Sequence, residues 1–133
     1  MKAYLLWFSL IIFTLAIICC NNPTTPPGGP SATGNPPTVP YNPNPHDSTN
    51  GVSRNVFLVW HTEDPDTGDS TLCDIYMSKT SPPNIQIASN VRILGYQPDR
   101  LDSLTTYYWE VFVRDLHGHT VTGPVWRFTT GNF

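Results

Sequence analysis

Charged residues are scarce in this 133-residue sequence, and the few basic ones do not cluster. Only 13% of the residues are Asp, Glu, Lys or Arg, and the formal net charge is −3. A protein that binds nucleic acid needs Lys and Arg side chains to neutralise phosphate groups. We therefore exclude nucleic acid as an expected partner, and the length indicates one ordinary domain.

Sequence motifs of the common enzyme classes are also missing. The chain has no Gly-rich phosphate loop, no Gly-x-Ser-x-Gly turn, no His-Glu-x-x-His and no Cys-x-x-Cys. No nucleophile can be paired with a base from the sequence. We therefore predict a protein that is not an enzyme and has no catalytic residues.

Cysteine is rare, and two of the three cysteines are adjacent, at Cys19 and Cys20. The third, Cys73, is alone in the C-terminal part, so no disulfide can form within that part. Strand alternation places Cys73 on the same face as apolar neighbours. We expect it to be a small buried apolar residue rather than a reactive thiol.

The single long apolar run lies at the start of the chain. Lys2 precedes fifteen uncharged residues, 4–18, which is typical of a signal peptide and short of the roughly 20 residues that a membrane helix needs. The run ends at Cys19-Cys20 and is followed by Asn21. A run that ends in this way resembles the lipobox of bacterial lipoproteins.

This resemblance implies that residues 1–19 are a signal peptide and that Cys20 carries a covalent lipid. Cys19 is the alternative, although the large Ile18 precedes it, whereas Cys20 follows a small residue. The residues also leave open an uncleaved anchor or a released product. The resemblance implies a location in the cell envelope, contact with the membrane through the lipid, and an outer membrane, since Asn21 stands where Asp would favour inner-membrane retention.

Residues 20–45 are expected to form a disordered tether. Nine of the 14 prolines lie between residues 21 and 45, and that stretch contains no Lys, Arg, Asp or Glu. Two large apolar side chains cannot bury enough surface to offset the entropy of ordering the segment. We expect the tether to hold the rest of the chain away from the membrane.

Residues 46–133 show short β-rich runs separated by turn residues, and no apolar period of 3.6 residues. This pattern predicts an all-β fold, a single seven-stranded immunoglobulin-like sandwich. Its core is expected to include Trp60, Tyr107 and Trp109. The expected strands are 56–60, 71–78, 85–88, 91–96, 106–115 and 121–130, with an edge strand within 41–54.

The order of several aromatic and turn residues resembles a fibronectin type III domain over residues 44–130. The residues that carry the resemblance are Trp60, the Leu101–Thr105–Tyr107 spacing, and the stretches 107–111 and 123–130. The resemblance implies that the Tyr107 hydroxyl bonds the backbone just upstream, with Leu101 packed nearby. Ser103 and Leu104 depart from that family, which usually has Pro and then Gly or Asn there.

The same topology implies that the loops after 56–60 and after 106–115 meet at one end of the sandwich. These loops contain Asp64, Asp66, Asp69, Asp115, His117 and His119. Asp and Gly in this spacing are typical of polar turns, which is the interpretation we favour. Calcium on Asp64, Asp66 and Asp69, or a transition metal on the imidazoles, is the alternative. We expect no cofactor besides the lipid if the loops are turns.

Three further aromatic residues, Tyr76, Tyr108 and Phe112, fall on non-core positions of neighbouring strands. Such a strip is typical of a contact surface for a protein or glycan. We expect a monomeric, non-catalytic envelope lipoprotein that displays a binding or spacer module. An accessory that binds carbohydrate or cell wall within a polysaccharide-processing system is the alternative.

Overall fold

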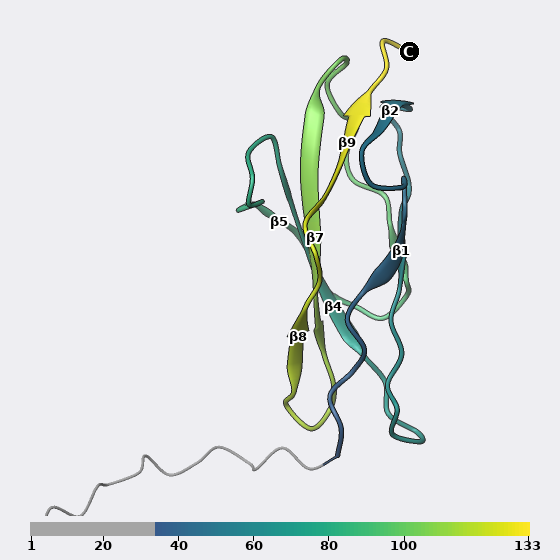
Figure 1. Cartoon of the computed structure of the whole chain (residues 1–133), viewed down its shortest axis with the longest axis vertical. Coiled ribbons are helices and arrows are strands. Elements are labelled where there is room, and N and C mark those ends of the chain that lie inside the picture. The colour runs from purple at the N-terminus through teal and green to yellow at the C-terminus, as the bar shows by residue number, and fades with distance from the viewer. Residues whose placement is uncertain (1–33) are drawn as a thin grey trace, which may run out of the picture.

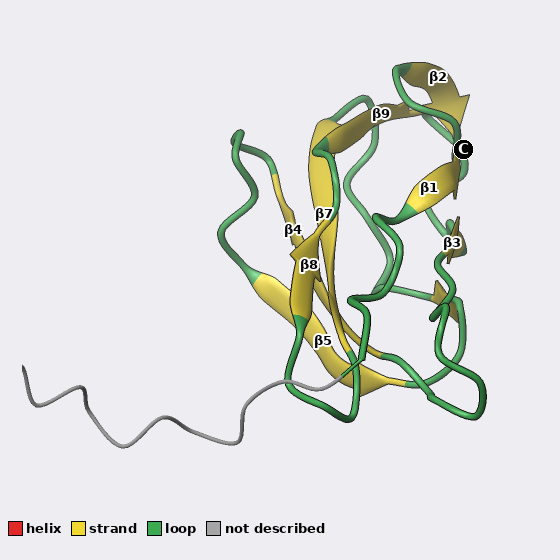
Figure 2. Cartoon of the chain, turned by 60° about the horizontal axis from the view of Figure 1, so that its bottom comes forward, coloured by secondary structure: helices red, strands yellow, loops and turns green. Residues whose placement is uncertain are grey.

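The computed structural model describes residues 34–133, and this part of the chain folds into a β-sandwich without helices. The strands form a three-stranded sheet and a larger one of six strands. Figures 1 and 2 show the two layers on opposite sides of the core. The predicted all-β sandwich is therefore confirmed. The strands are β1 (Tyr41–Asn44), β2 (Thr49–Val52), β3 (Leu58–His61), β4 (Leu72–Ser78), β5 (Gln86–Val91), β6 (Gly95–Tyr96), β7 (Thr106–Arg114), β8 (Thr120–Thr122) and β9 (Trp126–Thr130).

The larger sheet is built around β7 and β4, the two longest strands. Its order is β2-β9-β7-β4-β5, with β8 beside the end of β7. Along β7 every second side chain is buried, starting at Tyr107, and the alternate ones are half-buried. This two-residue period is that of a strand with one face on the core. The smaller sheet has the order β1-β3-β6 and closes the core from the other side.

The core between the sheets is rich in tryptophan. Trp60 from the smaller sheet meets Trp109 from the larger one edge-on, with ring centroids 6.5 Å apart. Trp109 also contacts Trp126, at 4.7 Å. Cys73 is buried as a free cysteine, and burial raises the pKa of its thiol. The buried apolar residues are Val56, Leu58, Trp60, Cys73, Ile75, Met77, Leu101, Tyr107, Trp109, Val111, Val113, Trp126 and Phe128.

The last expected strand, 121–130, is divided in two. β8 and β9 both run along the same edge of β7, and Gly123-Pro124 separates them. The Gly123 N–H donates to the Val111 carbonyl at 2.8 Å. A Cβ at Gly123 would lie 3.0 Å from that oxygen and 3.2 Å from Pro40. Only glycine fits this close approach without a shift of its neighbours.

The sandwich begins earlier than residue 46, so the predicted end of the tether at Pro45 is wrong. Residues 41–44 form β1 and pair with β3, and Pro40 is fully buried. The Thr38 N–H donates to the Glu63 carbonyl at 2.8 Å. The low apolar content of this stretch concealed it, because backbone hydrogen bonds and proline packing hold it instead. The expected signal peptide, Cys19, Cys20 and the tether before residue 34 lie outside the described residues.

Tyr107 ties the start of β7 to the loop before it. Its hydroxyl accepts a hydrogen bond from the Asp102 N–H at 3.0 Å, and Leu101 is buried beside the core. Thr130 closes the same corner, since its hydroxyl donates to the Asp102 carbonyl at 2.6 Å and accepts from the Thr105 N–H at 2.9 Å. The geometry is the one that the fibronectin type III resemblance implied for Tyr107.

Leu104 occupies the position where that family usually has Gly or Asn, and its backbone is left-handed, with φ of 51°. Its side chain is 74% exposed, so it contributes little to the core. We expect Leu104→Gly to raise the free energy of unfolding by about 0.5–1 kcal/mol, because glycine adopts this φ without strain. Denaturant unfolding measures the change. Leu116→Gly is the control: this leucine is also exposed, but its φ is not positive, and a stabilisation there would contradict the explanation.

Candidate functional site

The most densely polar part of the described chain is one end of the sandwich, where the β3–β4 and β7–β8 loops meet. At its centre is Asp115, whose side chain is completely buried. One carboxylate oxygen accepts from the backbone N–H groups of His117 (2.9 Å) and His119 (2.8 Å). The other contacts His119 Nδ1 at 2.5 Å. Burial alone would raise the pKa of Asp115, but these hydrogen bonds outweigh it and lower the pKa.

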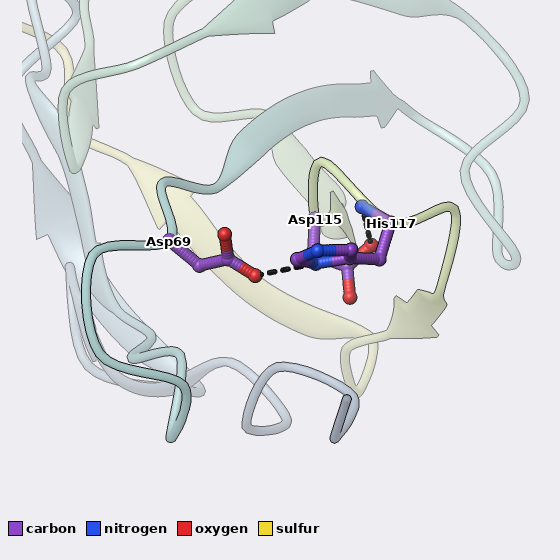
Figure 3. A group of neighbouring side chains, drawn as sticks. All are labelled: Asp69, Asp115 and His117. Atoms are coloured by element: carbon purple, nitrogen blue, oxygen red, sulfur yellow. Dashed lines mark hydrogen bonds and ion pairs between the residues drawn. The ribbon is translucent and has the colours of Figure 1, made fainter. Parts of the chain in front are cut away.

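His117 reaches from the β7–β8 loop to the opposite loop. Its Nδ1 lies 2.7 Å from Oδ2 of Asp69, and Figure 3 shows the carboxylate pointing at the imidazole from the facing loop. One oxygen or nitrogen atom from each of Asp69, Asp115 and His117 lies within 4.8 Å of the other two. The sequence alone placed these residues in two loops, and the fold brings them into one group.

Asp64, Asp66 and Asp69 also come together, with one oxygen of each within 4.8 Å of the others. Both oxygens of Asp66 accept hydrogen bonds from Asn35, at 2.6 and 2.9 Å, which lower the pKa of Asp66. Asp64 Oδ1 accepts from the Asp66 N–H at 3.0 Å, as in a polar turn. Calcium at these three residues stays a prediction.

The expected aromatic strip lies on the outer face of the larger sheet. Tyr76 on β4 and Phe112 on β7 are half-buried and meet edge-on, with centroids 5.0 Å apart. Tyr108 lies further along the same face of β7, about four residues before Phe112, and is opposite Ser78 of β4. Between them is Glu110, directly across from Tyr76, and burial raises the pKa of its carboxyl. The strip is therefore one aromatic pair, Tyr76 with Phe112, and a separate Tyr108, with the Glu110 carboxyl group between them.

A polar groove of about 270 Å³ lies beside Tyr108. Arg127 crosses it, with Nε donating to the Ser48 hydroxyl at 3.1 Å. The groove also contains a pair of hydroxyl groups, since the Oγ1 atoms of Thr106 and Thr129 lie 2.9 Å apart. The lining residues are Ser48, Asn50, Thr106, Tyr108, Arg127, Phe128 and Thr129. Hydroxyl, amide and guanidinium groups thus adjoin the aromatic strip.

A second group of aromatic side chains was missed by the sequence reasoning. Tyr41, Phe57 and His61 are exposed on the outer face of the smaller sheet, and the Tyr41 and His61 rings are 5.7 Å apart. Tyr41 lies both in the expected tether and at the start of the range 41–54 expected to contain an edge strand, but the sequence does not predict that it pairs with β3. The signal for Phe57 was its alternation with Val56 and Leu58, which are both buried.

No helix in residues 34–133 is long and apolar enough to cross a membrane. No protein-family model matches the chain, and no curated protein matches it. These two searches leave the solved structures as the basis of comparison.

Solved structures share the fold at low identity. An alpha-L-rhamnosidase from Dictyoglumus thermophilum aligns over 75% of this chain, at 14% identity and a TM-score of 0.55. One from Streptomyces avermitilis, complexed with L-rhamnose, aligns over 72%, at 19% identity and a TM-score of 0.51. The aligned parts are only 13% and 10% of those two chains.

Smaller proteins align over most of their length. CopC from Methylosinus trichosporium OB3b aligns over 70% of this chain and 92% of its own, at 14% identity and a TM-score of 0.50. The fibronectin type III domain of human fibronectin type III domain containing protein 3 covers 76% and 92%, at 21% identity and a TM-score of 0.47. At such identities the likeness is of the fold alone, a β-sandwich.

Proposed function

We propose that this protein is a non-catalytic lipoprotein of the bacterial cell envelope, held by a lipid on Cys20, whose sandwich binds a partner. The support for the anchor is in the sequence: an apolar run that ends at Cys19-Cys20, then a Pro-rich stretch. Two or more acyl chains anchor a protein stably, whereas one does not. The first described residue in contact with the sandwich is Asn35, so about 15 residues would separate it from the lipid on Cys20 and hold the domain away from the membrane.

The partner that the outer face of the larger sheet fits best is a glycan of the envelope. The observation that carries this proposal is the partly exposed strip of Tyr76, Phe112 and Tyr108 beside a groove of hydroxyl and amide groups. Aromatic faces bind the apolar C–H side of sugar rings, and the polar groups supply hydrogen bonds to sugar hydroxyls. Arg127 lies opposite Tyr108 on the neighbouring strand and Glu110 two residues further along β7, so charged groups adjoin this ring.

Similarity to the rhamnosidases shows only the fold, so we base the glycan contact on the sheet face. The wider role that follows is an accessory of a polysaccharide-processing system, which holds a polymer close to the membrane without cleaving it. A protein that merely spaces other components would have no need of the strip, and the test of binding separates the two roles.

The glycan contact is tested by pull-down of the full chain, in detergent, with purified peptidoglycan and with outer-membrane polysaccharide. We expect Tyr108→Ala combined with Phe112→Ala to reduce the bound fraction about tenfold or more, since aromatic anchors dominate such contacts. Tyr41→Ala with Phe57→Ala removes two exposed aromatic residues from the other sheet and is the matched control. Equal loss in both double variants, or none in either, would refute the assigned face.

The anchor is tested by fractionation and intact mass of the membrane-bound protein. We expect a chain that starts at Cys20 and carries two or three acyl groups. Cys20→Ser is expected to remove the lipid, whereas Cys19→Ser keeps it. A membrane-bound protein that retains Met1 without lipid would refute the lipoprotein proposal and leave the glycan contact standing.

A further inference from the structure

The end of the sandwich shown in Figure 3 has an arrangement that the glycan contact does not use. Asp69, Asp115 and His117 each offer one atom to a group in which all three lie within 4.8 Å of one another. We propose that these three residues bind a divalent transition-metal ion, with zinc as the reference ion. This inference is independent of the proposed function, because none of the three residues lies on the aromatic strip.

The spacing of the donor atoms fits such an ion. Zinc holds imidazole nitrogen and carboxylate oxygen at about 2.0–2.2 Å, so tetrahedral donors are about 3.4 Å apart. Asp69 Oδ2 and His117 Nδ1 are now 2.7 Å apart and joined by a hydrogen bond through one proton. An ion that replaces this proton needs the two atoms to separate by only some tenths of an ångström, which a loop side chain allows. Water completes the coordination.

Asp115 is built to serve as a fixed ligand. Its side chain is completely buried, and hydrogen bonds from the backbone of His117 and His119 hold one oxygen in place. His119 Nδ1 contacts the other oxygen, and metal-bound carboxylates have hydrogen-bond partners of this kind. His119 is therefore a positioning residue, whereas Asp69, Asp115 and His117 touch the ion.

A separate observation concerns charge at this end of the molecule, where Arg92 lines the same cavity as Asp64 and Asp69 but forms no ion pair with either. Oδ2 of Asp64 is buried and has no hydrogen-bond partner among the described residues. Asp64 shares with Asp69 the neighbouring group of carboxylates. The ion pairs formed here within residues 34–133 involve only His117 and His119. An oxygen buried in this way is costly unless a cation compensates it.

The donor set favours a transition metal over calcium. Calcium takes six to eight oxygen ligands and avoids imidazole, whereas zinc, nickel and copper bind nitrogen well. The imidazole of His117 therefore favours a transition metal. Asp69 belongs both to the group with Asp115 and His117 and to the group with Asp64 and Asp66.

The experiment is zinc titration of the full chain, in detergent, without a polyhistidine tag and after treatment with a chelator. We expect one zinc per chain by calorimetry and a rise in melting temperature on addition of zinc. His117→Gln is expected to weaken binding about 100-fold or more, and His119→Gln about 10- to 100-fold. Asp66→Asn and His46→Gln are expected to leave zinc affinity unchanged, since neither residue is in the group.

Circular dichroism checks that His117→Gln is folded, and cobalt(II) absorption reports the ligands directly. Loss of the cobalt spectrum in His117→Gln, with a folded chain, supports the site. Absence of zinc binding to the unaltered protein overturns the proposal. So does zinc affinity that falls as much in His46→Gln as in His117→Gln, which would mean adventitious surface histidines. A melting-temperature rise with calcium alone, abolished by Asp66→Asn, would instead select the neighbouring carboxylate group.

Discussion

Trp109→Ala is expected to lower the free energy of unfolding by about 3–5 kcal/mol. Trp109 is fully buried and lies between Trp60 of the facing sheet and Trp126 of the next strand. Its removal leaves a cavity at the point where the two sheets meet, and the rigid strands cannot close it. A domain of this size has only about 5–15 kcal/mol of stability, so the variant is expected to lose a large fraction of the total.

Two further variants make the explanation specific. The Nε1 of Trp109 has no hydrogen-bond partner among the described residues, so Trp109→Phe removes an unsatisfied donor along with part of the ring. We expect it to cost less than about 2 kcal/mol. Ile93→Ala truncates a side chain that is 67% exposed and is expected to change stability by less than about 0.5 kcal/mol. Chemical denaturation measures the three losses of stability. An order other than Trp109→Ala largest, Trp109→Phe intermediate and Ile93→Ala smallest would contradict this explanation.

Asp115→Ala is expected to cost about 2–4 kcal/mol, measured by denaturant unfolding in the presence of a chelator. The substitution leaves the N–H groups of His117 and His119 without their acceptor. Asp115→Asn keeps one acceptor oxygen and is expected to cost less. Asp99→Ala, at an exposed loop carboxylate, is the control and is expected to be nearly neutral.

The same residue predicts a loss of stability in acid. The folded pKa of Asp115 lies below its ordinary value, so the unfolded chain binds the proton more readily. The stabilisation from the ionised carboxylate is therefore complete above about pH 4, the range of an unperturbed Asp. It is lost as the pH falls through the lower pKa of the folded state. A pH profile of Asp115→Ala that is as steep in acid as that of the unaltered protein would contradict this assignment.

The sandwich was predictable from sequence because period-two alternation records which side of a strand is buried. In β7, the residues expected to face inward from Tyr107 onward are the buried ones. β1 and β2 both lie in the range 41–54, where an edge strand is expected, but alternation does not fix their bounds. The four residues Tyr41–Asn44 of β1 contain a proline and two asparagines, and the strand is ordered by its pairing with β3.

At the end of the sandwich where the β3–β4 and β7–β8 loops meet, the sequence predicted which residues lie in the loops but not which side chains contact one another. The acidic loop and the histidine loop were visible as residues 61–69 and 115–119, and the topology implied that they meet. The 2.7 Å contact of His117 with Asp69 depends on side-chain conformations across 48 residues of sequence, which no local pattern contains. The same holds for the two hydrogen bonds from Asn35 that occupy Asp66.

If the chain is anchored as proposed, the contacts of Asn35 and Thr38 are the first in the domain to bear a pull on the preceding residues. Tension that arrives at residue 34 first loads the two hydrogen bonds between Asn35 and Asp66. It next loads Thr38, which is bonded to Glu63, and only then β1. These bonds lie one behind another along the chain, so they would open in sequence at low force. Residues 35–38 would then detach before the strands separate, and the tryptophan core between the sheets would stay intact at that stage.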